Sequence, residues 1–231
     1  MAQQIVTLAE DPQPPYVNVT DGKITGGIAV QIVQKIFDKL PEVDVNFELM
    51  PWKRALVEAK YGRTDGIIFV SKNQEREEYL AYSDAIFEGR AVFFYRKPPM
   101  SKRFNWHTLS DLAPYTIVAI RGQGILKILQ TRAKDANLAL NIHVVNNEET
   151  AMSMLQLGRV DLALFNEIVG KTMVNNNDDY FYIVAADKVF AARTYHMALS
   201  KKSKARELMP RINDIILELK SNGEIDQILD F

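Results

Sequence analysis

Apolar positions follow two regular patterns along the first half of the chain. Short apolar or alternating runs predict strands, and apolar residues at i, i+3, i+4 and i+7 predict helices. These patterns predict strands at 5–9, 43–50, 66–70 and 91–95, and helices from about 28 to 40 and from Trp52 to a stop at Gly62. Asp21-Gly22 predicts a turn, and the three prolines between 12 and 15 predict a stiff extended loop.

The composition changes at Lys97-Pro98-Pro99, and the order of elements then begins again. The second half is expected to hold strands at 116–120, 142–145 and 162–165, helices at about 125–136, 148–157 and 168–174, and then a strand at 195–200, a helix at 205–219 and a last helical turn at 224–229. Asn146 or Asn147 would cap the helix that starts at 148.

One short arrangement occurs once in each half. Gly62-Arg63-Thr64-Asp65 and Gly158-Arg159-Val160-Asp161 each follow a predicted helix and precede a buried strand that ends in a polar loop. Two such series of strands and helices predict an α/β protein with two lobes.

The chain is expected to build lobe 1 from two separate segments and lobe 2 from a single one. We expect lobe 1 to contain residues 3–94 plus 196–231, and lobe 2, inserted into lobe 1, to contain residues 95–195. The chain would then cross between the lobes twice, and paired crossing strands are typical of a hinge. Pockets favour domain interfaces, so a ligand cleft is expected between the lobes.

The segment from Trp52 to Arg76 is the strongest candidate for function. Ser71 follows the strand predicted at 66–70, and ligands of open α/β sheets bind at the carboxyl ends of strands. Arg76 offers a planar set of donors that matches a carboxylate. The alternative is a plain turn in which Arg76 pairs with Glu75 or Glu78.

Composition narrows the class of protein. The chain has 231 residues, of which 47% are hydrophobic and 25% charged, as in a folded globular protein. The formal net charge of -1 gives no field that would attract nucleic acid or an anionic membrane. The chain has no cysteine, so disulfides and thiolate chemistry are excluded. No apolar run approaches the ~20 residues of a transmembrane helix.

The polar start, Met1-Ala2-Gln3-Gln4, lacks the apolar core of a signal peptide. It fits a cytoplasmic protein, or a mature exported chain that has been given a new initiator Met.

Known catalytic patterns are missing from the sequence. His107, His143 and His196 are scattered without the spacing of metal ligands, and no nucleophile elbow, zinc-protease or phosphate-loop motif occurs. Gly122-Gln123-Gly124 lacks the third glycine of a dinucleotide fingerprint. We therefore expect no catalytic residue, no metal and no cofactor.

Six short segments, in this order and spacing, resemble the bacterial family 3 solute-binding proteins, the periplasmic polar-amino-acid-binding components of ABC importers. They are Pro15-Tyr16, Gly27-Ile28, Asp65-Gly66-Ile67-Ile68 with Ser71 and Glu75-Arg76, Tyr82-Ser83-Asp84, Gly158-Arg159-Val160-Asp161 and Asn222-Gly223. The resemblance covers roughly the whole chain. It implies a type II periplasmic binding protein fold: two Rossmann-like lobes, joined by two crossing hinge strands, that close on a ligand like a Venus flytrap.

The resemblance also implies roles for single residues. Arg76 and Ser71 match the family's carboxylate clamp, and Gly122-Gln123-Gly124 falls where backbone N–H groups of the second lobe complete it. Trp52 would stack on the ligand or merely cover the edge of its lobe, and Asn166 would contact the ligand or merely cap a helix. The expected ligand contacts are Glu10, Tyr16, Trp52, Arg54, Phe69, Ser71, Arg76, Arg121, Gly122, Gln123, Gly124 and Asn166.

Four positions depart from the family. Asn166 replaces the Asp that pairs with a ligand ammonium, Phe69 replaces a small hydroxyl residue, Gln31 replaces an acidic residue, and Arg121 stands where Gln is common. We hypothesise that the ligand carries a carboxylate and need not be a standard α-amino acid.

The resemblance implies a periplasmic monomer that delivers a small ligand to the membrane permease of an ABC transporter. Two alternatives remain. One is a sensor domain of the same fold. The other is an enzyme similar to periplasmic cyclohexadienyl dehydratases, with Glu10 or Glu167 as general acid.

Overall fold

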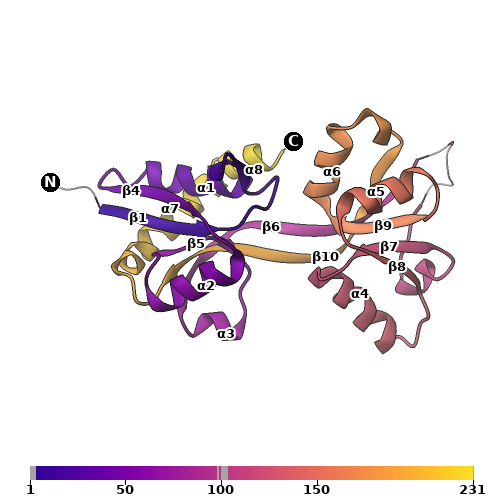
Figure 1. The fold of residues 1–231 in the computed structure, drawn as a ribbon, viewed down its shortest axis with the longest axis horizontal. Helices are drawn as coiled ribbons and strands as arrows, with labels where there is room; N and C mark the ends of the chain where they lie inside the picture. The colour runs from indigo at the N-terminus through magenta and orange to yellow at the C-terminus, as the bar shows by residue number, and fades with distance from the viewer. Residues whose placement is uncertain (1–3, 98, 100–103, 231) are drawn as a thin grey trace. The chain divides into compact units, whose positions relative to one another are not determined.

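A computed structural model describes residues 4–97, 99 and 104–230, so Pro98 of the Lys97-Pro98-Pro99 segment, and Met1, Ala2 and Gln3 of the polar start, lie outside the described residues. The chain forms two compact units: unit 1 is Met1–Glu88 with Arg193–Phe231, and unit 2 is Gly89–Ala192. Two long strands, β6 (Leu80–Arg96) and β10 (Ile183–Ser200), pass from one unit to the other (Figure 1). The boundaries expected from the sequence, at 94/95 and 195/196, fall within these same two strands.

Unit 1 is built on the strand order β4-β1-β5-β10. β1 (Gln4–Glu10) pairs in parallel with β4 (Val43–Leu49) and with β5 (Gly66–Val70), and β10 pairs antiparallel with β5. Every residue of β5 is buried, because strands lie on both sides of it and helices cover both faces. The other elements of unit 1 are β2 (Asn18–Thr20), β3 (Lys23–Gly26), α1 (Ile28–Asp38), α2 (Trp52–Tyr61), α3 (Gln74–Glu77), the 3-10 helix η3 (Lys204–Leu208), α7 (Met209–Ser221) and α8 (Glu224–Leu229).

The helices α1 and α2 lie on opposite faces of this sheet (Figure 1). The apolar residues of α1, among them Ile32 and Ile36, are fully buried, as its amphipathic pattern predicts. α2 ends where Gly62 adopts a left-handed conformation with φ of 73°, which is the helix stop predicted from the sequence. At the start of α1, the backbone N–H groups of Ile28 and Ala29 donate to the backbone oxygens of Pro15 and Tyr16 in the loop that follows β1.

Unit 2 repeats the plan with the order β6-β9-β7-β8. β7 (Thr116–Ile120) pairs in parallel with β8 (Asn141–Val145) and β9 (Leu162–Asn166), and β6 pairs antiparallel with β9. The helices are α4 (Gly124–Asp135), α5 (Glu148–Gln156) and α6 (Glu167–Asn175), with 3-10 helices η1 (Leu109–Leu112) and η2 (Asp178–Tyr180).

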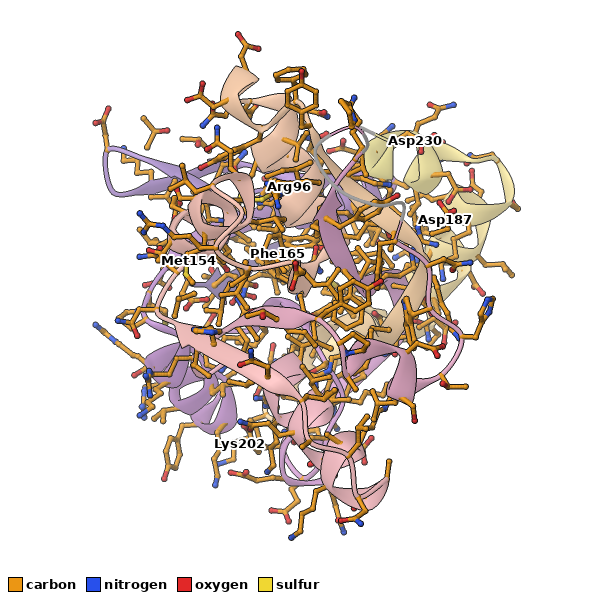
Figure 2. All side chains as sticks on the ribbon, turned by 90° about the vertical axis from the view of Figure 1, so that its right-hand side faces the viewer. Arg96, Met154, Phe165, Asp187, Lys202 and Asp230 are labelled. Atoms are coloured by element: carbon orange, nitrogen blue, oxygen red, sulfur yellow. The ribbon has the colours of Figure 1, made fainter. Side chains whose placement is uncertain are left out.

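Alternate residues of these strands build two separate cores, one on each face of the sheet. Phe93 and Leu164 pack with Leu129 of α4, whereas their chain neighbours Phe94 and Phe165 pack on the other face, against α5. Phe165 belongs to this second core and the partly buried Met154 packs against it; both are labelled in Figure 2. The sheet of unit 2 is therefore buried on both faces.

Most of the predicted helices and strands are confirmed, but three expectations were too short or too simple. β6 begins at Leu80 and β10 at Ile183, well before the strands predicted at 91 and 195. The helix predicted from 205 begins as 3-10 helix and becomes α-helix only at Met209, where Pro210 stands near its start. Within the described residues, no helix is long and apolar enough to cross a membrane.

Candidate functional site

Three of the predicted ligand contacts lie together in unit 1. The Cζ atom of Arg76 is 5.2 Å from the centre of the Trp52 ring, and Nη1 of Arg76 donates a hydrogen bond to the backbone oxygen of Ser71 at 3.2 Å. Trp52 also packs against the core beneath α2, so it both covers the edge of the unit and supports the guanidinium. The structure thus assembles Trp52, Ser71 and Arg76 as one cluster.

Local sequence explains why Arg76 lies there. β5 ends at Val70, and Asn73 caps the short helix α3 by accepting a hydrogen bond from the backbone N–H of Arg76 at 2.8 Å. Among the described residues, no carboxylate forms an ion pair with Arg76, so the pairing with Glu75 or Glu78 does not occur. A half-buried guanidinium on an aromatic face, with a single hydrogen bond from its planar fork, is suited to receive an anion.

Two further predicted contacts, Tyr16 and Phe69, belong to a cluster of four aromatic rings in unit 1. Phe87 from β6 and Tyr195 from β10 complete it, and every pair of the four ring centres is between 5.2 and 6.4 Å apart. Tyr16, Phe69 and Phe87 are at most 4% exposed. Phe87 and Tyr195 were not predicted, because β6 and β10 are far apart in the sequence and no short motif joins them.

Glu10, at the carboxyl end of β1, is buried beside this cluster, with 1% of its surface exposed. Its Oε2 accepts a hydrogen bond from the backbone N–H of Phe69 at 3.3 Å, and its Oε1 accepts one from that of Asp11 at 3.2 Å. Burial raises the pKa of the Glu10 carboxyl well above its ordinary value, although the two backbone hydrogen bonds oppose the shift. Asp11 hydrogen-bonds to this carboxyl, and burial raises the pKa of Asp11 as well.

Arg54 lies apart from these groups. Its side chain is 68% exposed, and its Nε is 3.9 Å from a carboxylate oxygen of Glu58, one helical turn further along α2. Within unit 1 the structure gives Arg54 this surface ion pair with Glu58.

The glycine-containing loop of unit 2 connects β7 with α4. Arg121 is exposed and its Nε donates to the side-chain oxygen of Asn146 at 3.2 Å. Gln123 donates from Nε2 to a carboxylate oxygen of Glu148 at 2.7 Å, and Gly122 has a φ of 81°, which favours glycine. The loop thus presents one guanidinium and the first backbone N–H groups of a twelve-residue helix that begins at Gly124.

Asn166 is the last residue of β9 and the N-cap of α6. Its Oδ1 accepts hydrogen bonds from the backbone N–H groups of Ile168 at 3.0 Å and Val169 at 3.2 Å. The capping role considered from the sequence is therefore real, and the half-buried side chain remains at the carboxyl end of the strand.

Glu167, one of the two residues considered as a general acid, is held by two cations. Its Oε2 lies 2.7 Å from Nη2 of Arg90, and its Oε1 lies 2.7 Å from Nζ of Lys171. Partial burial opposes ionisation, but the hydrogen bonds and charges of these two partners prevail and lower the pKa of Glu167. A carboxylate that is ionised and paired in this way is a poor proton donor.

No group of three or more potential metal-ligating side chains occurs within residues 4–97, 99 and 104–230.

The predicted site residues form two clusters in unit 1, Trp52-Ser71-Arg76 and Glu10-Tyr16-Phe69, with Arg54 apart. In unit 2 they lie at the carboxyl ends of β7 and β9.

Comparison with known proteins places these features in a family. The model of the bacterial extracellular solute-binding proteins, family 3, matches residues 5–230. No match was found among curated proteins.

Several solved structures share the fold. The second substrate-binding domain of GlnP from Lactococcus lactis, in an open conformation, has a TM-score of 0.81 at 19% identity, with 99% of this chain and 94% of that chain covered. The second substrate-binding domain of a putative amino acid ABC transporter from Streptococcus pneumoniae has a TM-score of 0.80 at 18% identity, with 99% and 98% covered. A histidine kinase sensor domain has a TM-score of 0.68 at 19% identity, with 98% and 95% covered. At such identities the likeness establishes the fold alone, which is that of the type II periplasmic binding proteins.

Proposed function

Because the chain belongs to family 3 of the bacterial extracellular solute-binding proteins, we propose that it captures a small ligand that carries a carboxylate, an amino acid or a related organic acid, and delivers it to an ABC importer. The protein acts as a monomer in the periplasm, and its partner is the membrane permease of that importer. Arg76 holds the carboxylate of the ligand.

The observation that carries this proposal is the set of contacts made by the Arg76 guanidinium. Its guanidinium rests on Trp52 and makes one hydrogen bond to a backbone oxygen, and no described carboxylate pairs with it. A carboxylate that binds there would make the charge-assisted, two-point contact for which the guanidinium fork is shaped.

The test begins with a thermal-shift screen of the purified protein against amino acids, organic acids and small peptides. A ligand at 100 times its dissociation constant adds about 2.7 kcal/mol to the unfolding free energy, which is easily detected. Calorimetry with the best carboxylate then compares the wild type with Arg76→Ala. We expect a loss of about 2–5 kcal/mol of binding free energy, because a desolvated charge pair is removed.

Arg206→Ala is the matched control. Arg206 also lies in unit 1 and, like Arg76, donates from Nη1 to a backbone oxygen five residues earlier, in this case that of Lys201 at 2.9 Å. The Arg206→Ala protein should bind the carboxylate as tightly as the wild type does. A loss below ~0.5 kcal/mol for Arg76→Ala, or an equal loss for both variants, would remove Arg76 from the site.

A second candidate function is ligand sensing, since a histidine kinase sensor domain has the same fold. Uptake of the labelled ligand separates the two roles. A deletion strain should lose uptake, and the wild-type gene but not Arg76→Ala should restore it. Unchanged uptake in the deletion strain would favour the sensor.

A further inference from the structure

Cations are concentrated on one surface of unit 1, which is built from residues 53–63 of α2 and its end and from residues 200–206 at the start of η3. The two segments are in contact. Oγ of Ser200 donates a hydrogen bond to the backbone oxygen of Ala59 at 2.6 Å. Nζ of Lys202, labelled in Figure 2, lies 5.2 Å from the centre of the Tyr61 ring. We call this surface the α2–η3 face.

The α2–η3 face is strongly basic, although the whole chain is nearly neutral. Its cations are all exposed: Lys53, Arg54, Lys60, Arg63, Lys201, Lys202, Lys204 and Arg206. Its one carboxylate is Glu58, so the face has a formal charge of +7, eight minus one, and the rest of the chain carries -8, because the total is -1. The charge is still +4 when Asp65, Glu77 and Glu207, which border the two segments, are counted.

Few of these charges are neutralised within the protein. Arg54 and Arg63 share the carboxylate of Glu58. Within residues 4–97, 99 and 104–230, none of the other six cations forms an ion pair. Like charges that are crowded on one surface repel one another, and an anionic surface that covers them relieves this repulsion.

Two exposed apolar side chains lie among the cations of α2. Val57 is 45% exposed and Tyr61 is 55% exposed. Helical spacing places them on the same side of α2 as Lys53 and Lys60. A basic helix surface with a few apolar side chains is typical of a helix that rests on a membrane, where a tyrosine ring and the stems of lysines fit the level of the headgroups.

The composition of the α2–η3 face favours a lipid surface over an acidic protein. Protein interfaces have an apolar core and are depleted in lysine. Here five of the eight cations are lysines, and Val57 and Tyr61 are the only large apolar side chains exposed within the two segments. A flexible lysine acts as a point charge and needs no partner of matching shape, which suits headgroups that move in the plane of a membrane.

We propose that the α2–η3 face binds the surface of a membrane that contains anionic lipids. The inference does not depend on the proposed function, because it uses neither Arg76 nor the residues that lie with it, Trp52 and Ser71. Each lysine or arginine near such a surface strengthens binding by a factor of about five. The binding is reversible, and salt weakens it.

The test measures how the 231-residue protein sediments with sucrose-loaded vesicles. One set of vesicles contains equal parts of phosphatidylglycerol and phosphatidylcholine, and the other contains phosphatidylcholine alone. We expect the wild type to sediment with the anionic vesicles and not with the neutral ones. It should be released when the salt is raised from about 0.1 M to about 1 M, because the Debye length falls from about 10 Å to about 3 Å.

The double variant Lys53→Gln/Lys60→Gln should bind the anionic vesicles about 25-fold more weakly, because two cations are lost. Both side chains are exposed and glutamine is a good helix former, so the fold should be kept. Lys53→Arg/Lys60→Arg should bind as tightly as the wild type. The matched control is Lys127→Gln/Lys134→Gln in α4 of unit 2, where two exposed lysines are also seven residues apart and the same charge is removed. It should leave vesicle binding unchanged.

Three outcomes would overturn the inference. Equal binding to the neutral and the anionic vesicles would show adsorption without a role for charge. Equal losses for the two glutamine variants would show that the total charge of the protein, and not the α2–η3 face, governs binding. Failure to bind the anionic vesicles would exclude the membrane. If poly-L-glutamate then bound the wild type but not Lys53→Gln/Lys60→Gln, the partner of this face would be an acidic polypeptide.

Discussion

The guanidinium of Arg76 lies over the indole ring of Trp52, with 5.2 Å between Cζ and the ring centre. The two residues come from different elements, α3 and the first position of α2, and the ring is held by the core under α2. The aromatic face both attracts the cation and limits its rotamers, so that the fork is oriented before a ligand arrives.

Trp52→Ala should therefore weaken carboxylate binding by about 0.5–2 kcal/mol, the range of a cation–π contact, whereas Trp52→Phe should keep part of the affinity. Calorimetry with the carboxylate found in the screen measures the effect. Tyr61→Ala is the control, since the exposed Tyr61 ring also carries a cation, with Cζ of Arg63 5.0 Å from its centre, outside the candidate site. Equal losses for the two alanine variants would contradict the prediction.

Glu10 should make the stability of the protein fall as the pH rises. Its pKa is raised in the folded state above the ordinary value of 4.5, so the folded state holds a proton that the unfolded state releases. The contribution is fully present below pH 4.5 and is lost as the pH rises through the folded pKa.

Glu10→Gln should flatten the urea-unfolding free energy between pH 5 and 8, because a neutral amide cannot ionise. Glu48→Gln is the control: Glu48 lies on the adjacent strand β4 and is exposed. It should leave the wild-type slope in place. A slope that persists in Glu10→Gln would assign it to another group.

Glu167 should make the stability of the protein fall as the pH falls, which is the opposite of the effect of Glu10. Its folded pKa is lowered from 4.5, so its pairs stabilise the protein above pH 4.5, and this contribution is lost as the pH falls through the folded pKa. Arg90 and Lys171 are 48% and 51% exposed, so solvent screening reduces the value of each pair. We expect Glu167→Gln to cost about 1 kcal/mol at pH 7 in urea unfolding.

Glu149→Gln controls for the helix dipole, because Glu149 occupies the first turn of α5 as Glu167 does that of α6, and it is exposed. A cost for Glu149→Gln as large as that for Glu167→Gln would show that helix position, not the pairs with the two cations, accounts for the effect.

The sequence predicted best the elements that are defined by a few consecutive residues. β5 is predicted residue for residue, because five consecutive apolar residues between two polar loops leave only a buried strand. The stop of α2 follows from Gly62 alone. β10 was recognised only in its last third, because Asp187, Lys188 and Arg193 interrupt the apolar pattern of a strand whose middle leaves unit 2 for unit 1.

The candidate site divides in the same way. Trp52, Ser71 and Arg76 lie within one short segment, so the sequence could indicate them together. The ring cluster around Tyr16 could not be predicted, since Phe87 and Tyr195 reach it from β6 and β10. The burial of Glu10, whose Oε2 accepts a hydrogen bond from the backbone N–H of Phe69, was likewise not predicted from the sequence.

At Gly170 in α6, helix propensity and packing predict opposite effects of an alanine substitution on stability. Alanine is favoured over glycine in a helix by about 1 kcal/mol. A Cβ at Gly170 would, however, collide with the ring of Phe94 and lie 2.7 Å from Cε2 of Phe165. These two rings are stacked with their centres 4.9 Å apart and are at most 1% exposed, so they have little room to yield. Overpacking of this kind costs about 1–3 kcal/mol.

We therefore expect Gly170→Ala to destabilise the protein by about 1–2 kcal/mol in urea unfolding. Phe94→Leu alone should also destabilise it, because ring contacts are lost. The double variant should lose less than the sum, by about 0.5–3 kcal/mol, because the smaller side chain makes room for the new methyl group. Strict additivity, or a Gly170→Ala protein more stable than the wild type, would mean that α6 shifts on the sheet and that the close packing against Phe94 does not constrain it.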